Sequence, residues 1–148
     1  MDNRLKINPP LYLMGKKIYC WSCNFKMTVI TLLATHVEDT ENQICILSDI
    51  DELPNGVLSY IQKKAPNFKR KFSKMARKKY FANTCPKCNV ISGDFFLHSE
   101  PGAPFFPTDE AGAKSLYITE IPLSEPIMAK ASLGLGVGDL ILKNAKRI

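Results

Sequence analysis

Long apolar runs and an export signal are both missing from this sequence. The longest apolar stretch, Val29 to Ala34, is interrupted by Thr31 and is far shorter than the roughly 20 residues needed to cross a bilayer. The charged start, Met1 to Lys6, is not followed by the apolar segment of a secretory signal. These absences predict a protein of the cytoplasm with no membrane partner.

Recognisable catalytic motifs are also missing. The two histidines, His36 and His98, have no serine or spare activated cysteine at motif spacing, so the sequence does not support a nucleophilic site. The glycine-rich segment from Gly134 to Gly138 lacks the spacing and the following helix of a nucleotide-binding loop. We therefore expect no enzyme activity and no small-molecule substrate.

Acidic residues are absent from one continuous segment, Leu53 to Val90. This segment holds ten of the twenty Lys and Arg residues, and the remainder, with ten basic and fourteen acidic residues, has a net charge of −4 in a chain of +6. A charge run is most often a solvated helical face, but this asymmetry also favours an anionic partner. The predicted partner-binding residues are Lys63, Lys64, Lys69, Arg70, Lys71, Lys74, Arg77 and Lys78.

Cysteine is sparse, but four of the five cysteines form two Cys-x-x-Cys pairs, Cys20 with Cys23 and Cys85 with Cys88. Each pair can turn both sulfurs toward one ion, and four thiolates suit tetrahedral Zn²⁺ with Zn–S distances of about 2.3 Å. Such a shell has no open position for water, so we predict a structural zinc ion. Cys45 stands in an apolar run outside both pairs and is predicted to be a small core residue.

Three other chemistries compete with zinc. A redox-active pair would place its first cysteine at the start of a helix, whereas Cys23 is followed by the β-rich run Lys26 to Leu32. Disulfides would need an oxidising compartment, to which nothing directs the chain. Iron in the same four-sulfur shell has similar geometry, and the sequence leaves this alternative open.

The order of the hydrophobic patterns predicts a single α+β domain over residues 1–148, with a mainly antiparallel sheet that carries both cysteine pairs. Residues 1–13, with Pro9 and Pro10, are predicted to be an extended lead-in. The expected strands are Lys16–Tyr19, Lys26–Ala34, Gln43–Leu47, Lys78–Ala82, Leu116–Ile121 and Asp139–Lys143.

Two helices are expected between the cysteine pairs. The first begins near Pro54, where apolar residues recur at helical spacing. The second begins near Asn67, a plausible cap, and would bury one face while its Lys and Arg residues occupy the rest. The residues of that apolar face are Phe68, Phe72, Met75 and Ala76.

The segment around the second cysteine pair resembles a group of poorly characterised bacterial proteins with two Cys-x-x-Cys motifs. In that group an aromatic-x-Asn-x-Cys-x-x-Cys segment leads to Gly-Asp-aromatic, as in Tyr80–Cys88 and Gly93–Leu97, and an earlier Cys-Trp-x-Cys matches Cys20–Cys23. The match covers roughly Tyr19 to Leu97 and departs at Ser92, where the group has Gln. The resemblance implies a zinc-ribbon-like site at the four paired cysteines and no known activity.

These patterns together predict a non-enzymatic, zinc-stabilised binding module whose basic surface contacts nucleic acid, since Lys and Arg can neutralise phosphates. The sequence contains no base-reading motif. The alternative is a protein-interaction role, such as a bacterial immunity or antitoxin-like protein that covers an acidic surface of its partner. Both roles need the same charges.

Overall fold

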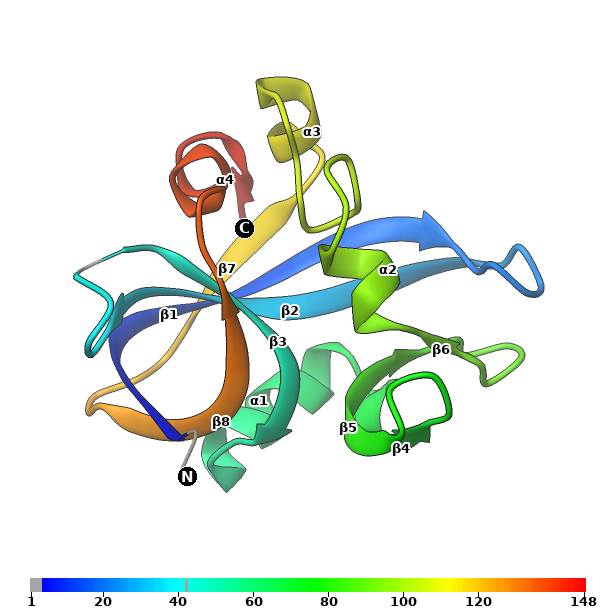
Figure 1. Ribbon diagram of the computed structural model, residues 1–148, viewed down its shortest axis with the longest axis horizontal. Helices are drawn as coiled ribbons and strands as arrows, with labels where there is room; N and C mark the ends of the chain where they lie inside the picture. The colour runs from blue at the N-terminus through cyan, green and yellow to red at the C-terminus, as the bar shows by residue number, and fades with distance from the viewer. Residues whose placement is uncertain (1–3, 42) are drawn as a thin grey trace.

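A closed, four-stranded antiparallel barrel forms the centre of the protein (Figure 1). The computed structural model describes residues 4–41 and 43–148. The barrel closes because β1 pairs with both β2 and β8, while β3 joins β2 to β8. Its strands are β1 (Arg4–Tyr19), β2 (Lys26–Val37), β3 (Cys45–Glu52) and β8 (Ile127–Gly134).

Strand β1 changes one of its neighbours halfway along its length. Arg4–Ile7 pairs with β8, whereas Leu11–Gly15 pairs with β7 (Tyr117–Ile121). Between them lie Pro9 and Pro10, joined by a cis peptide bond, where the register with β2 also shifts. Proline has no N–H to give to a strand ladder, so it is tolerated at such a break. From residue 4 onward, the predicted lead-in is therefore extended but belongs to the barrel, and residues 1–3 lie outside the described residues.

The two long strands β1 and β2 are buried on both faces. Successive side chains in a strand point to opposite sides, and here each side meets a different apolar cluster. Leu11, Leu13 and Leu32 belong to the barrel core, the cluster to which all four barrel strands contribute. Tyr12 and Met14 belong to an outer core on the opposite face, which also contains two of the paired cysteines.

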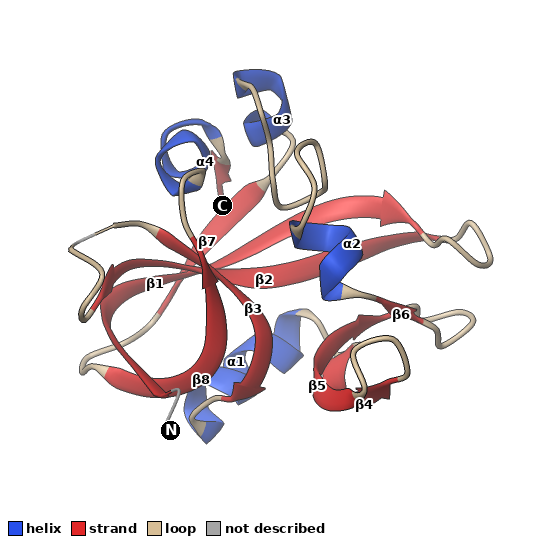
Figure 2. Cartoon of the chain, in the orientation of Figure 1, coloured by secondary structure: helices blue, strands red, loops and turns tan. Residues whose placement is uncertain are grey.

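Short helices lie around the strands (Figure 2), and they add side chains to both cores. Helix α1 (Asn55–Lys64) begins where predicted and adds Val57 and Ile61 to the barrel core. Among the described residues, no helix has the length and apolar character needed to cross a membrane. The other helices are α2 (Asp94–His98), α3 (Glu110–Lys114) and α4 (Gly138–Asn144), and the short strand β9 (Lys146–Arg147) pairs in parallel with β7.

A second antiparallel sheet carries the second cysteine pair and consists of β4 (Phe68–Ser73), β5 (Lys78–Thr84) and β6 (Ile91–Ser92). The buried side chain of Asn83 joins this sheet to the barrel. Its Oδ1 accepts a hydrogen bond from the N–H of Ile30 at 2.8 Å, and its Nδ2 donates to the carbonyl of Ile30 at 3.0 Å. The amide of Asn83 thus makes the two backbone hydrogen bonds that a neighbouring strand would otherwise make with Ile30 of β2.

The second predicted helix is wrong, because the segment from Asn67 forms the β4–β5 hairpin. Phe68 is buried and stacks on Phe81 across the hairpin, whereas Phe72 and Met75 are 54% and 87% exposed. Residues at helical spacing therefore do not share one buried face, and pairing with the following strand overrides the local pattern.

The predicted strand at Asp139–Lys143 is also wrong, since these residues lie within α4. A short apolar run does not distinguish a strand from a buried helical turn. Gly138 lets this helix begin against Ile44, the residue before β3, because a Cβ at position 138 would lie 2.5 Å from Cγ2 of Ile44. With one helix between the cysteine pairs where two were expected, the fold is mostly β and not α+β.

Candidate metal centre

Two loops far apart in the sequence bring the four paired cysteines together, as predicted. The first knuckle (Cys20–Cys23) joins β1 to β2, and the second knuckle (Cys85–Cys88) lies between β5 and β6 (Figure 1). The Sγ atoms of Cys20 and Cys88 are 3.6 Å apart, as are those of Cys23 and Cys85, and all four lie within 4.8 Å of one another.

The two knuckles have the same backbone arrangement. The N–H of Cys20 donates to the carbonyl five residues further along, and the N–H of Asn24 donates back to the carbonyl of Cys20. The same two bonds recur at Cys85 and Asn89. In both loops the N–H two residues after the first cysteine also points at its sulfur, at 3.4 Å. The equivalence explains how one ion can be bound between two unrelated stretches of chain.

Asn24 and Asn89 were not recognised from the sequence. Each follows the second cysteine of its pair and has a positive φ, 61° and 68° respectively. Asparagine adopts this left-handed conformation more readily than most residues, so it can turn the chain out of the knuckle. The repeated Cys-x-x-Cys-Asn pattern was the available signal.

The sulfur cluster fits a tetrahedral metal ion. Four Zn–S bonds of about 2.3 Å place neighbouring sulfurs about 3.8 Å apart, close to the two distances of 3.6 Å. Cys20 and Cys85 are buried, and Cys23 and Cys88 are partly buried. All four are free thiols in the structure, so the cluster could hold a metal such as zinc.

Backbone N–H groups favour the thiolate form at the first cysteine of each knuckle. Burial acts to raise the pKa of Cys85, but the N–H groups of Cys88 and Lys87 outweigh it and hold this pKa at about 6. The N–H of Cys23 is the largest cause that lowers the pKa of Cys20. Deprotonated thiols are the form that binds metal, so the loop geometry prepares two ligands in advance.

Cys45 lies away from this cluster. Its side chain is fully buried in the barrel core, as predicted, and burial raises the pKa of its thiol. The raised pKa disfavours the reactive thiolate. Cys45 therefore acts as a small core residue.

The eight predicted partner-binding residues divide into two groups. Four have partners inside the protein. Arg70 pairs with Asp51 at 2.7 Å, and Lys78 pairs with Asp49 at 3.6 Å. Lys71 donates a hydrogen bond to the carbonyl of Asn89, and the ammonium group of Lys64 lies over the ring of Tyr60. The acids missing from the local segment thus come from β3. Within residues 4–41 and 43–148, the side chains of the other four make no ion pair or hydrogen bond; they are those of Lys63, Lys69, Lys74 and Arg77.

No known family model matches the chain, and neither curated proteins nor solved structures give a match in sequence or fold. The likeness to bacterial double-Cys-x-x-Cys proteins therefore rests on the motifs alone. The four-cysteine cluster is the part of that likeness that the structure supports.

Proposed function

We propose that this protein is a non-enzymatic binding module, stabilised by a structural zinc ion, whose β4–β5 hairpin contacts nucleic acid. The observation that carries the proposal is the group of basic side chains without internal partners at this hairpin and the end of α1. Lys63, Lys69, Lys74 and Arg77 are exposed and unpaired within the part of the chain that the structure describes. Phosphates are the ligands that such charges attract most strongly.

Exposed aromatic side chains on the hairpin and on the first knuckle support the same proposal. Phe72 is 54% exposed and pairs across the hairpin with Lys79. Trp21 of the first knuckle is 67% exposed, while its Nε1 donates to the carbonyl of Ile91 at 2.8 Å. Unpaired bases stack on exposed aromatic rings with little sequence preference, so single-stranded nucleic acid is the favoured form.

The proposed zinc ion supports this surface without taking part in chemistry. Four cysteine ligands would fill its coordination shell and fix the first knuckle, with Trp21, beside the second sheet. The proposed module works in the cytoplasm, where thiolate ligands stay reduced.

Reversing three unpaired charges tests the proposal. We expect a variant with Lys63, Lys69 and Lys74 changed to Glu to bind a single-stranded oligonucleotide far more weakly than the wild type, as measured by fluorescence anisotropy. The slope of log K against log salt should become shallower by about two, because each lost phosphate contact removes about 0.7. Zinc content and thermal stability should change little, since exposed charges contribute about 0–1 kcal/mol.

The matched control changes Lys114, Lys143 and Lys146 to Glu. These three lysines are also exposed, and two of them also lie in the last turn of a helix. The two variants have the same net charge, so equal weakening in both would show that total charge and not the hairpin governs binding. Unchanged binding by the hairpin variant would remove the proposal.

A protein partner is the second candidate, in the manner of an immunity or antitoxin-like protein. Met75 at the hairpin turn is 87% exposed and Phe95 on α2 is 67% exposed, and large exposed apolar groups are typical of protein contacts. A native pull-down with and without nuclease separates the candidates. If one defined protein remains bound after nuclease treatment, the result favours a protein partner. If the bound material is released by nuclease, the result favours nucleic acid.

A further inference from the structure

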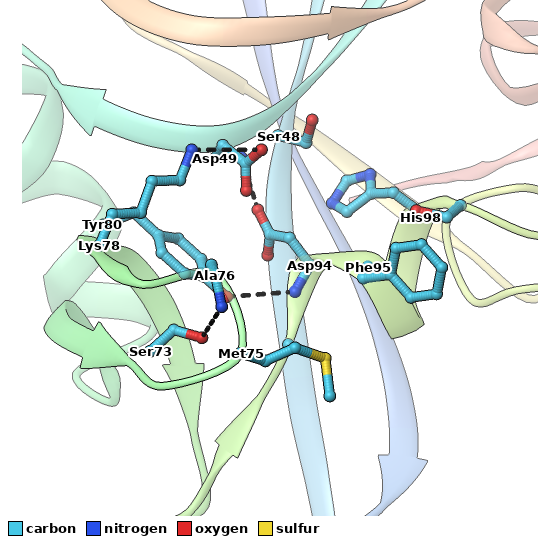
Figure 3. Close-up of a pocket in the computed structure, with 12 residues that line it drawn as sticks. Ser48, Asp49, Ser73, Met75, Ala76, Lys78, Tyr80, Asp94, Phe95 and His98 are labelled. Atoms are coloured by element: carbon cyan, nitrogen blue, oxygen red, sulfur yellow. Dashed lines mark hydrogen bonds and ion pairs between the residues drawn. The ribbon is translucent and has the colours of Figure 1, made fainter.

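A cavity of about 480 Å³ lies between β3, the β4–β5 hairpin and α2 (Figure 3). Sites for small molecules in proteins usually have volumes of about 300–1,000 Å³, so this cavity has a suitable size. None of the metal-binding cysteines lines it. The cavity is therefore separate from the candidate metal centre.

A buried carboxyl group forms the floor of the cavity. Asp94, the first residue of α2, is only 9% exposed. Its Oδ2 accepts a hydrogen bond from the N–H of Asp49 at 2.6 Å, and its own N–H donates to the hydroxyl of Tyr80 at 3.2 Å. Figure 3 shows the carboxyl group of Asp94 directed toward Asp49, with the His98 ring turned toward the same space.

The charges around this floor do not balance. Asp49 and Asp94 supply two carboxyl groups, and the one basic side chain among the lining residues, Lys78, is already paired with Asp49 at 3.6 Å. Burial holds the pKa of His98 down at about 4, so its ring is neutral at pH 7 and can accept a hydrogen bond. A cationic hydrogen-bond donor would fill the deficit.

The side walls of the cavity are apolar. Met75 and Ala76 come from the turn between β4 and β5, and Phe95 comes from α2. All three are exposed at the rim. These walls suit the hydrocarbon part of a ligand whose polar end reaches the carboxyl groups.

We propose that this cavity binds a small organic cation, a primary amine whose ammonium group lies between Asp94 and Asp49 and whose hydrocarbon part packs against Met75 and Phe95. An ammonium group has three donors, which match the two carboxyl groups and the neutral ring of His98. Among the described residues, the four paired cysteines are the only set placed to hold a metal ion, so a divalent cation is not favoured in the cavity.

Binding of an amine should strengthen as the pH rises through 7. Burial raises the pKa of Asp94 to about 7, and the charge of Asp49 acts in the same direction, against the N–H of Asp49 and the charge of Lys78. A bound ammonium group would favour the ionised form of the Asp94 carboxyl group, so binding would release the proton of Asp94. Tyr80 and His98 do not lose a proton near pH 7, because burial raises the pKa of Tyr80 and holds that of His98 at about 4.

The test titrates the intact, metal-loaded protein with hexylamine and, separately, with 1-hexanol, following backbone amide NMR signals. Hexanol has the same hydrocarbon part without the charge. We expect hexylamine to shift signals of cavity residues at concentrations below about 10 mM and to bind at least about tenfold more tightly than hexanol. Affinity should be higher at pH 8 than at pH 6.

Two variants locate the binding site. Asp94→Asn keeps an oxygen acceptor for the N–H of Asp49 and should weaken hexylamine at least about tenfold, removing its pH dependence. Met75→Ser should weaken both probes, whereas Met128→Ser, a matched change of another exposed methionine outside the cavity, should weaken neither. Equal binding of hexanol and hexylamine overturns the proposal, as does wild-type affinity in Asp94→Asn. If Asp94→Asn does not fold, the two methionine variants and the hexanol comparison decide.

Discussion

The barrel and the second sheet are held together in different ways. All four barrel strands contribute apolar side chains to one core, among them Leu11, Leu32 and Leu47, which are fully buried. The second sheet adds Phe68 to this core but also buries polar residues such as Asn83, Thr84 and Ser92. The barrel core is built from many apolar contacts, whereas the second sheet combines the apolar contact of Phe68 with a few specific links.

Those links can be named individually. The second knuckle joins the four-cysteine cluster, Asn83 binds the backbone of Ile30, and Arg70 pairs with Asp51 of β3. A sheet of three short strands has marginal stability unless it packs against another element. We therefore expect the barrel to tolerate local damage, whereas the second sheet should stay in place only while its attachments are intact.

Loss of the proposed zinc ion should therefore produce the largest effect, and this effect should be confined at first to the second sheet. Cys85→Ser removes a ligand, and structural zinc contributes about 10–16 kcal/mol of apparent binding energy. We expect no stoichiometric metal by elemental analysis and a loss of amide protection in β4, β5 and β6. Hydrogen exchange in β1 and β2 should stay slower, because their protection comes from the two apolar cores.

A chelator added to the wild type provides the control, since it should reproduce the same exchange pattern without a mutation. Simultaneous loss of protection in the barrel and the second sheet would contradict the comparison. It would mean that the two regions unfold as one cooperative unit.

Asn83→Ala should produce the next largest effect. The change leaves the N–H and the carbonyl of Ile30 buried without their partner, at about 1–3 kcal/mol for each group, or about 2–6 kcal/mol in all. Urea unfolding measures this loss, and metal content should be retained at low denaturant. Asn144→Ala, which removes an amide bonded to the carbonyl of Leu140, is the matched change and should cost far less. Equal costs would rule out a special attachment at Asn83.

Asp94 should make stability depend on pH between about 4 and 7. Its folded pKa of about 7 lies above the ordinary value of 3.8, so the folded protein holds a proton that the unfolded chain releases in this window. Stability from this group is present at low pH and is lost as the pH rises to 7, by a few kcal/mol at most. His98 has the opposite effect on stability, because its folded pKa of about 4 is below its ordinary value of 6.5. The stability from His98 is present above pH 6.5 and is lost as the pH falls to about 4.

The difference between wild type and Asp94→Asn isolates the contribution of Asp94. Thermal unfolding at pH 5 and pH 8 should show a smaller fall in stability for the variant than for the wild type. The same fall in both proteins would show that Asp94 does not bind its proton more tightly when folded.

Cys45→Ala should produce the smallest effect, and it tests whether the barrel core tolerates the loss of one buried atom. The change removes one sulfur atom from a distributed apolar core, at a cost of about 1 kcal/mol. Metal content should be unchanged, because Cys45 is outside the cluster. Loss of metal in this variant would show that the barrel core and the metal centre are coupled.

The cysteine cluster was predictable because each pair specifies its own turn. The spacing in Cys20–Cys23 and Cys85–Cys88 is local, and two such turns leave few ways to complete a tetrahedral shell. Strand signals near the knuckles were reliable for the same reason, since Lys26 opens a β-rich run that continues for twelve residues in β2. Local chemistry and local structure agree at this site.

The β4–β5 hairpin was not predictable, because its stability comes from residues outside the segment. The positions of Phe68 and Phe72 satisfy a helical period, while their true neighbours, Asn83 and Lys79, are on the following strand. The pairing of Arg70 with β3 is likewise a contact between distant segments. The cavity was missed because its floor combines residues that are far apart in the sequence. Asp49 of β3 donates a hydrogen bond to Asp94 of α2, 45 positions further along the chain.

The separation of the two knuckles also matters while the chain is being made. Cys23 and Cys85 are 62 residues apart, and ribosomes add about 5–20 residues per second, so the first pair waits about 3–12 s for the second to be synthesised. During that interval Cys20 and Cys23 can bind an ion with only two protein ligands, and their thiols are open to oxidation or to capture by another metal. With the proposed zinc ion as part of the fold, the metal supply during synthesis would influence how much of the newly made protein reaches the folded state.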